Sequence, residues 1–219
     1  MTFRNIILGL LVLIALSGIY QLFQIPGLVD KSKDFLAGRI DADTYRDETG
    51  SAVAAVQALP SLACIVLSIL WLHNLMRAHL ELGRRGTWGP GWAIGGWFLP
   101  PLVLYVIPML VLGETWKAAD PGVPLGDDSW RRGRVHPVLW VWWLLYGIAP
   151  LVFLVAGLRQ QFGNLGADEE DIAKSFVDNS GTLYGQAIVT LLAAGAWAGV
   201  VYLWTARHQR LVGMVAVAG

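Results

Sequence analysis

Residues 91–116, GWAIGGWFLPPLVLYVIPMLVLGETW, are long and apolar enough to cross a bilayer, yet they contain Pro100, Pro101 and Pro108. Proline removes an amide donor and clashes with the preceding helical turn. In hydrocarbon, such breaks are tolerated only where the backbone is buried in protein or lines a cavity. The stretch therefore either crosses as a kinked helix or enters and turns back near Pro100 and Pro101, and this choice decides the topology of the chain.

The composition is that of a membrane protein. Of the 219 residues, 55% are hydrophobic and 15% are charged, whereas soluble domains carry about 25% charged residues. The mean hydropathy is +0.53. Lys+Arg and Asp+Glu both total 16, so the overall charge carries no nucleic-acid signal, and we expect no nucleic-acid partner. The single cysteine, Cys64, excludes an intrachain disulfide and a CxxC motif.

Four further apolar runs have the length of a membrane-spanning helix, about 20 residues. They cover residues 6–25, 53–75, 137–158 and 184–205. The first could pass for a signal peptide, because one basic residue precedes it and Ala15-Leu16-Ser17 follows its apolar core. Its apolar character continues to Ile25, however, so we expect a retained first span.

The polar stretches between these runs differ in charge. Stretches 28–52 and 159–183 are acidic, whereas 77–90 and 117–136 are rich in arginine. If residues 91–116 turn back, ten Lys and Arg lie on one side of the membrane and six on the other, and a five-span chain gives the same division. The carboxylates do separate the two topologies, since turning back gives net charges of +5 and −5 and crossing gives about zero on each side.

A weak internal repeat favours the same answer. Leu70-Trp71 with Arg77 recurs as Leu203-Trp204 with Arg210, and the two acidic stretches close alike at 47–51 and 178–182. Two hairpins that face the same way require a connection that does not cross. We therefore predict a single all-α integral membrane domain with four transmembrane helices as two similar hairpins, 1–77 and 137–219. A basic loop and a Pro-broken re-entrant or interfacial segment, within 78–136, would join them. A kinked full span is the alternative.

Residues 71–121 resemble the core of the DUF4328 family of bacterial membrane proteins. The matching features are a Trp and a basic residue that end a span, a Pro-Gly-Trp, a Trp-Phe-x-Pro, a second Pro and a Glu-x-Trp. Here they are Trp71, Arg77, Pro90-Gly91-Trp92, Trp97-Phe98-Leu99-Pro100, Pro108 and Glu114-Thr115-Trp116. The chain departs from the family pattern at Asn74, where a basic residue is common, and after Pro100, where an Asn is common. The resemblance implies an architecture and no reaction.

The same segment supplies the candidate ligand- or partner-binding residues. They are Arg77, Trp97, Pro100, Pro101, Pro108, Glu114 and Trp116. An ionisable residue at membrane depth is a functional candidate, although Glu114 could instead form an ion pair with Arg77 or Arg84 or lie among headgroups. The tryptophans indicate an interface belt more than a ligand-stacking pocket. This set comprises Trp88, Trp92, Trp97, Trp116, Trp130, Trp140, Trp142 and Trp143.

Four histidines fall near predicted span ends, and imidazole is the commonest metal ligand. His73, His136 and His208 are therefore weak candidates for metal or haem ligands, as is His79, although polar residues near headgroups would look the same. No catalytic or phosphate-binding motif is present in the sequence. We expect no resident cofactor.

These patterns predict a non-enzymatic multi-pass protein that binds lipid or a protein partner, or that serves as an accessory subunit of a membrane complex. The alternatives are a small transporter with a polar cavity at the proline break and a haem or metal redox protein. We expect membrane lipids as partners, and either another membrane protein or a second copy of the chain. The Lys and Arg distribution predicts that both termini lie in the cytoplasm, and the resemblance to DUF4328 implies a bacterial cytoplasmic membrane.

Overall fold

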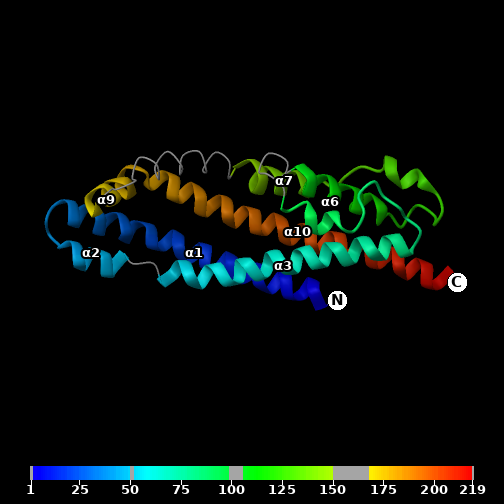
Figure 1. Ribbon diagram of the computed structural model, residues 1–219, viewed down its shortest axis with the longest axis horizontal. Helices are drawn as coiled ribbons and strands as arrows, with labels where there is room; N and C mark the ends of the chain where they lie inside the picture. The colour runs from blue at the N-terminus through cyan, green and yellow to red at the C-terminus, as the bar shows by residue number, and fades with distance from the viewer. Residues whose placement is uncertain (1, 50–51, 99–105, 150–167, 219) are drawn as a thin grey trace.

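The computed structural model describes residues 2–49, 52–98, 106–149 and 168–218, which form an elongated helical bundle (Figure 1). Three long helices run along it, α1 (Thr2–Leu36), α3 (Ala52–Glu81) and α10 (Ser180–Ala218). All three are long and apolar enough to cross a membrane, over Phe3–Leu36, Leu59–Glu81 and Ser180–Ala216. The protein is therefore all-helical over the described ranges, with three candidate membrane-spanning helices.

Helix α1 packs against both of the other long helices, which extend beyond its N-terminus toward one end of the bundle (Figure 1). The shorter elements surround this core. They are α2 (Ala42–Thr49), α4 (Trp92–Gly95), α6 (Val106–Ala118), the 3-10 turn η1 (Asp128–Arg132), α7 (Pro137–Trp143), the π-helical turn η2 (Leu144–Ile148) and α9 (Glu169–Asp178).

The predicted fourth span, 137–158, is described only in its first half. There α7 and η2 form an apolar helix over Pro137–Ile148. It begins at Pro137, whose fixed φ suits the first helical position, and Nδ1 of His136 accepts a hydrogen bond from the Val138 amide. Residues 150–158 lie outside the described residues, so a fourth span stays a prediction.

The two acidic stretches come together at one end of the bundle. They contribute the end of α1 together with α2 and α9, and Arg46 of α2 forms an ion pair with Glu169 of α9. This pair lowers the pKa of the Glu169 carboxyl through a hydrogen bond from Arg46 and raises the pKa of Arg46. Tyr45 stacks on Phe35 with ring centroids 4.7 Å apart, and its hydroxyl lies 3.0 Å from that of Ser32. These contacts fold the predicted acidic loops into one helical cap.

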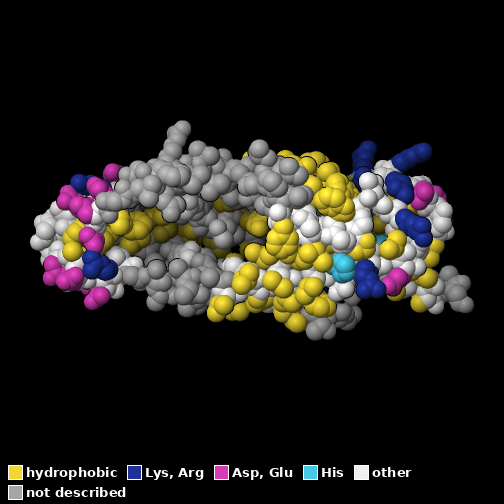
Figure 2. Space-filling view, viewed as in Figure 1, with side chains coloured by type: hydrophobic (Ala, Val, Ile, Leu, Met, Phe, Trp, Pro, Cys, Tyr) yellow, Lys and Arg dark blue, Asp and Glu magenta, His cyan; other side chains and the backbone are white. Residues whose placement is uncertain are grey.

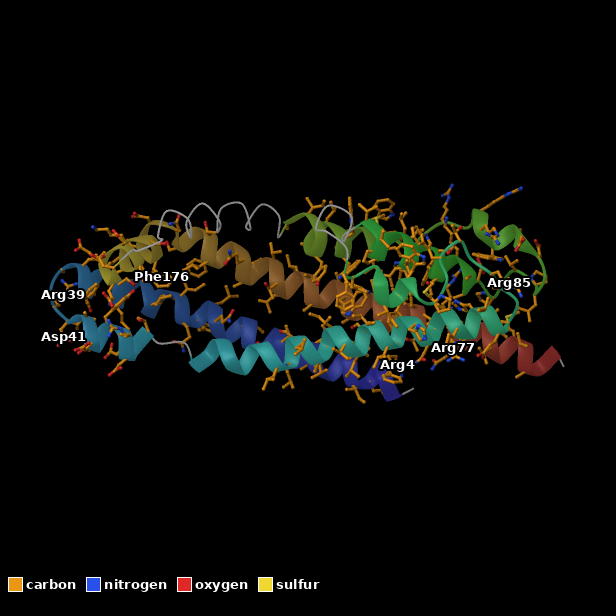
Figure 3. All side chains as sticks on the ribbon, in the orientation of Figure 1. Arg4, Arg39, Asp41, Arg77, Arg85 and Phe176 are labelled. Atoms are coloured by element: carbon orange, nitrogen blue, oxygen red, sulfur yellow. The ribbon has the colours of Figure 1, made fainter. Side chains whose placement is uncertain are left out.

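Charge is segregated along the long axis of the molecule. Carboxylates gather at the end that holds α2 and α9, and Lys and Arg side chains gather at the other end (Figure 2). Figure 3 places Arg39 and Asp41 at the first end and Arg77 and Arg85 at the second. We call these the acidic end and the basic end.

Two reciprocal hydrogen bonds join α3 to α10 through indole side chains. Trp71 of α3 donates its Nε1–H to Thr205 Oγ1 of α10 at 3.0 Å, and Trp197 of α10 donates to Ser68 Oγ of α3 at 3.0 Å. Both bonds are buried, and the two rings meet edge to face at 6.1 Å. The long helices are therefore bridged by two indoles.

The predicted interface location is wrong for some of the tryptophans. Trp116, Trp130 and Trp142 are buried in the protein, whereas Trp92 and Trp140 are exposed. An indole N–H needs a hydrogen-bond partner when it is buried. The Nε1 of Trp116, for example, donates to the Arg134 carbonyl at 3.1 Å. Several tryptophans thus serve packing inside the bundle instead of anchoring at the interface.

We expect Ser68→Ala to lower the free energy of unfolding by about 1 kcal/mol, because it leaves the buried Trp197 N–H unpaired. Ser17→Ala is the matched control, since among the described residues the Ser17 hydroxyl bonds only the Ile14 carbonyl of its own helix, at 2.9 Å. Unfolding in mixed micelles of increasing denaturing detergent measures both variants. Equal stability of the two would contradict a role for the bridge.

Candidate functional site

Glu114, near the end of segment 91–116, is hydrogen-bonded to the residues just before that segment. The Thr87 amide donates to Glu114 Oε1 at 2.6 Å, and the Trp88 amide donates to Glu114 Oε2 at 2.9 Å. Residues that precede α4 are therefore bonded to a residue near the end of α6. The two ends of the 91–116 segment lie side by side at the basic end.

Glycine permits this close approach. A Cβ added to Gly86 would lie 2.3 Å from Glu114 Oε2, and one added to Gly96 would lie 2.9 Å from Ile107 Cγ2. The first contact brings the loop before α4 onto the carboxylate. The second brings the end of α4 onto the start of α6, and both helices also pack on α3.

The expected ion pair between Glu114 and Arg77 or Arg84 is wrong. Arg77 is exposed and pairs with Glu81 of its own helix at 3.8 Å. Arg84 is buried and donates to the carbonyls of Ala118, at 2.9 Å, and Val123. Ala118 ends α6, where carbonyls lack intrahelical partners, so Arg84 caps that helix. Burial lowers the pKa of the Arg84 guanidinium, which Asp120 partly counteracts.

Trp97 follows α4 and reaches an aromatic cluster inside the bundle. Its ring contacts Trp142 at 6.3 Å, Tyr146 at 6.4 Å and Trp197 at 6.5 Å between centroids, each edge to face. Trp142 also stacks on Tyr146 at 5.4 Å and packs on Trp197 at 4.8 Å. Edge-to-face and offset arrangements are the favoured geometries for such rings. The segment, α7 with η2, and α10 therefore meet in one cluster.

This cluster forms a wall of a cavity of about 280 Å³, which we call the aromatic cavity. Its lining is Leu11 and Ile14 of α1; Ser61, Cys64, Ile65 and Ser68 of α3; Trp97; Trp142, Leu145 and Tyr146; and Val189, Thr190, Ala193, Ala194 and Trp197 of α10. The space-filling view shows hydrophobic side chains in a hollow beside the middle of the bundle (Figure 2).

The polar groups of the lining are few and are mostly engaged within the protein. Ser68 accepts the Trp197 N–H, and Thr190 donates to the Gln186 carbonyl at 2.8 Å. The Nε1 of Trp97 is buried and has no hydrogen-bond partner among the described residues. No charged side chain belongs to the part of the lining that the structure describes. The cavity is thus suited to an apolar occupant.

Of the predicted binding residues that the structure describes, one belongs to the aromatic cavity. Trp97 lines it, whereas Pro108 is buried within α6, and Pro100 and Pro101 lie outside the described residues. Arg77 projects from the exposed surface of α3 at the basic end (Figure 3).

Trp116 belongs to a separate cluster nearer the basic end. Its ring packs on Trp204 at 4.5 Å and on His136 at 5.2 Å. The Arg207 guanidinium lies over the same ring at 4.4 Å and pairs with Asp120 at 2.7 Å. The cation–π contact and the ion pair fasten the end of α6 to α10.

The histidines are placed by contacts within the protein. His73 Nδ1 lies 3.0 Å from the Pro90 carbonyl, His136 begins α7, and His208 Nδ1 lies 3.1 Å from His79 Nε2. Among the described residues, no three His, Cys, Asp or Glu side chains are grouped so that they could hold a metal ion. The haem and metal alternative therefore gains no support from their arrangement.

Sequence reasoning missed Ser68, Trp142, Tyr146 and Trp197 as members of the site. Trp142 was assigned to the interface belt, and the other three are scattered in apolar runs. A signal did exist, because Ser68 and Trp71 of one run and Trp197 and Thr205 of another are matched donors and acceptors. Their pairing required knowledge of how α3 and α10 face each other.

Comparison with known proteins identifies one family. The model of a family described as a domain of unknown function, DUF4328, matches residues 40–206. No curated protein and no solved structure matches the chain. The match extends well beyond the 71–121 stretch on which the resemblance was first based, and it includes the aromatic cluster.

We expect Gly86→Ala to destabilise the protein, because the added methyl group displaces the Glu114 carboxylate from the Thr87 and Trp88 amides. Hydrogen bonds to a charged group contribute about 1.5–3 kcal/mol each, and partial exposure of Glu114 reduces this, so a loss of about 2 kcal/mol is expected. Thermal unfolding in detergent measures it. Gly89→Ala is the matched control, because a Cβ there meets nothing within 4 Å. Equal effects of the two substitutions would refute the assignment.

Proposed function

The chain belongs to the DUF4328 family, and we propose that it is a non-enzymatic multi-pass membrane protein whose aromatic cavity binds the hydrocarbon part of a lipid. The cavity, apolar and about 280 Å³ in volume, is the observation that carries this proposal. An engineered apolar cavity of about 150 Å³ stays dry and binds benzene. A larger cavity of the same character can accept a segment of an acyl or isoprenoid chain.

The lining also includes side chains through which such a chain could enter. Ile65 of α3 and Tyr146 of η2 both line the cavity, and they are 45% and 36% exposed. A helix surface with apolar exposed residues faces lipid in a membrane protein. Entry from the bilayer between α3 and η2 is consistent with these two positions.

A transport role requires a polar path, and the described lining carries no charged side chain. Apolar binding is therefore the role that the cavity supports better. The same property agrees with a lipid-binding module or with an accessory subunit that holds structural lipid at its contact with a partner.

We further propose four spans, with 91–116 as a segment that dips into the membrane from the basic end and returns. The bonds of Glu114 to Thr87 and Trp88 support this topology, because they join the two ends of the segment. The contact between α2 and α9 supports this topology too. Helix α2 follows the first span, α9 follows the proposed third span, and the two helices meet at the acidic end. By the positive-inside rule, the basic end with both termini would then face the cytoplasm of a bacterial cell.

Single cysteines test this topology in a Cys64→Ala background, where the buried native thiol is absent. Under the proposal, Cys at Asp43 reacts with an impermeant maleimide from one side of the membrane and Cys at Asp128 from the other. Both aspartates are highly exposed. Labelling of the two positions from the same side would mean that residues 91–116 cross the membrane.

Filling the cavity tests the binding proposal. In vesicles of phosphatidylcholine with a dibrominated acyl chain, bromine should quench the buried tryptophans of the wild-type cavity as well as the lipid-facing ones. Ala194→Leu places extra volume in the lining and should reduce the buried component of this quenching. Gly195→Leu, one residue away and facing open space, should leave it unchanged. Equal quenching in all three proteins would overturn the proposal.

A further inference from the structure

Cations from three separate segments converge at the basic end. Arg131 of η1 donates from Nη2 to the backbone carbonyl of Arg85, in the loop between α3 and α4, at 2.6 Å. Lys117, near the end of α6, donates from Nζ to the Arg131 carbonyl at 3.4 Å. These contacts bring the side chains of Arg131 and Lys117 onto the backbones of Arg85 and Arg131, so three residues far apart in sequence are neighbours at the basic end.

Carboxylates do not neutralise this group. Arg131 has a 3.6 Å surface pair with Asp128, and such an exposed pair is weak. Glu114 is engaged by the Thr87 and Trp88 amides. Within the described ranges, no carboxylate lies within ion-pair distance of Arg85 or Lys117.

Two further carboxylates nearby are engaged elsewhere: Asp120 pairs with Arg207 at 2.7 Å, and Asp127 serves the local backbone. It accepts from the Ser129 amide at 2.8 Å and from the Ser129 hydroxyl at 3.0 Å, so it caps η1. These hydrogen bonds lower the pKa of its carboxyl, with smaller contributions from Arg132 and Arg84. Asp127 is therefore ionised at neutral pH, but its oxygens are occupied by Ser129, and it forms no ion pair with Arg85, Lys117 or Arg131 among the described residues.

Exposed indoles indicate that the headgroup layer lies next to these cations. Trp92 is 41% exposed and Trp140 is 49% exposed, and indoles are enriched at headgroup depth. Trp92 meets Trp88 edge to face at 5.1 Å, and the Trp88 amide is bonded to Glu114, three residues before Lys117. The cations thus lie just beyond the exposed tryptophans, where lipid phosphates are found.

We propose that Arg85, Lys117 and Arg131 form a binding site for the phosphate of an anionic phospholipid headgroup. Guanidinium groups match phosphate oxygens in a bidentate fashion, and lysine adds a compact charge. The site is independent of the aromatic cavity, because its residues belong to the loop before α4, the end of α6 and η1. A specific lipid bound there would hold these three segments together at the membrane surface.

Lipid retention tests this site in the full-length protein. Wild-type protein is reconstituted in nanodiscs that contain equal amounts of phosphatidylglycerol and phosphatidylcholine, then released into mild detergent, and the bound lipids are counted by native mass spectrometry. Each cation near the surface is worth about fivefold in affinity. We therefore expect enrichment of phosphatidylglycerol in the wild type and a loss of roughly twentyfold in Arg85→Gln/Lys117→Gln.

The controls keep the outcome interpretable. Lys33→Gln/Lys174→Gln removes the same charge at the acidic end and should retain the enrichment. Arg85 donates no side-chain hydrogen bond within the described residues, so Arg85→Gln alone should fold normally and still bind less phosphatidylglycerol. Absence of enrichment in the wild type, or its retention in the double variant, would overturn the proposal. Displacement of the lipid by inorganic phosphate at constant ionic strength would do so too, since the site would then take a soluble phosphate.

Discussion

The width of the bundle depends on two indole N–H groups. Trp71 and Trp197 each donate across the space between α3 and α10, to Thr205 and Ser68. In an apolar environment an unpaired N–H is costly, so these bonds specify which faces of the helices meet. The side chains that make them are large, and they keep the two helices apart. The aromatic cavity lies in this space. Small residues of α10 beside Trp197, such as Ala193 and Ala194, contribute to its lining.

The proline-rich segment contributes Trp97 to the lining of this cavity. Proline leaves it unable to form one continuous helix, and Glu114 gathers its two ends by accepting two backbone amides. Trp97, which follows α4 in this segment, reaches the aromatic cluster. The hydrogen bonds of Glu114 and the ring contacts of Trp97 therefore belong to the same segment.

The two ends of the molecule differ in how their charged side chains are engaged. At the acidic end, carboxylates pair with nearby cations, as Arg46 does with Glu169 and Lys31 with Glu48 at 3.3 Å. At the basic end, Arg77 and Arg207 also pair with carboxylates, but Arg84 donates to backbone carbonyls at the end of α6. The first arrangement builds a self-contained cap. The second leaves Lys and Arg side chains at the surface of the basic end (Figure 2).

Composition and the length of the apolar runs were sufficient to predict an all-helical membrane protein, and the Pro/Trp/Glu pattern was sufficient to suggest its family. These features are local: apolar run length, proline positions and charge distribution are properties of neighbouring residues. The partners of Glu114, the burial of Trp116, Trp130 and Trp142, and the union of Trp97 with Trp142 and Trp197 were decided only by tertiary structure. A side chain's donor or ring finds its partner across helices, and sequence spacing within one helix does not determine which faces of separate helices meet.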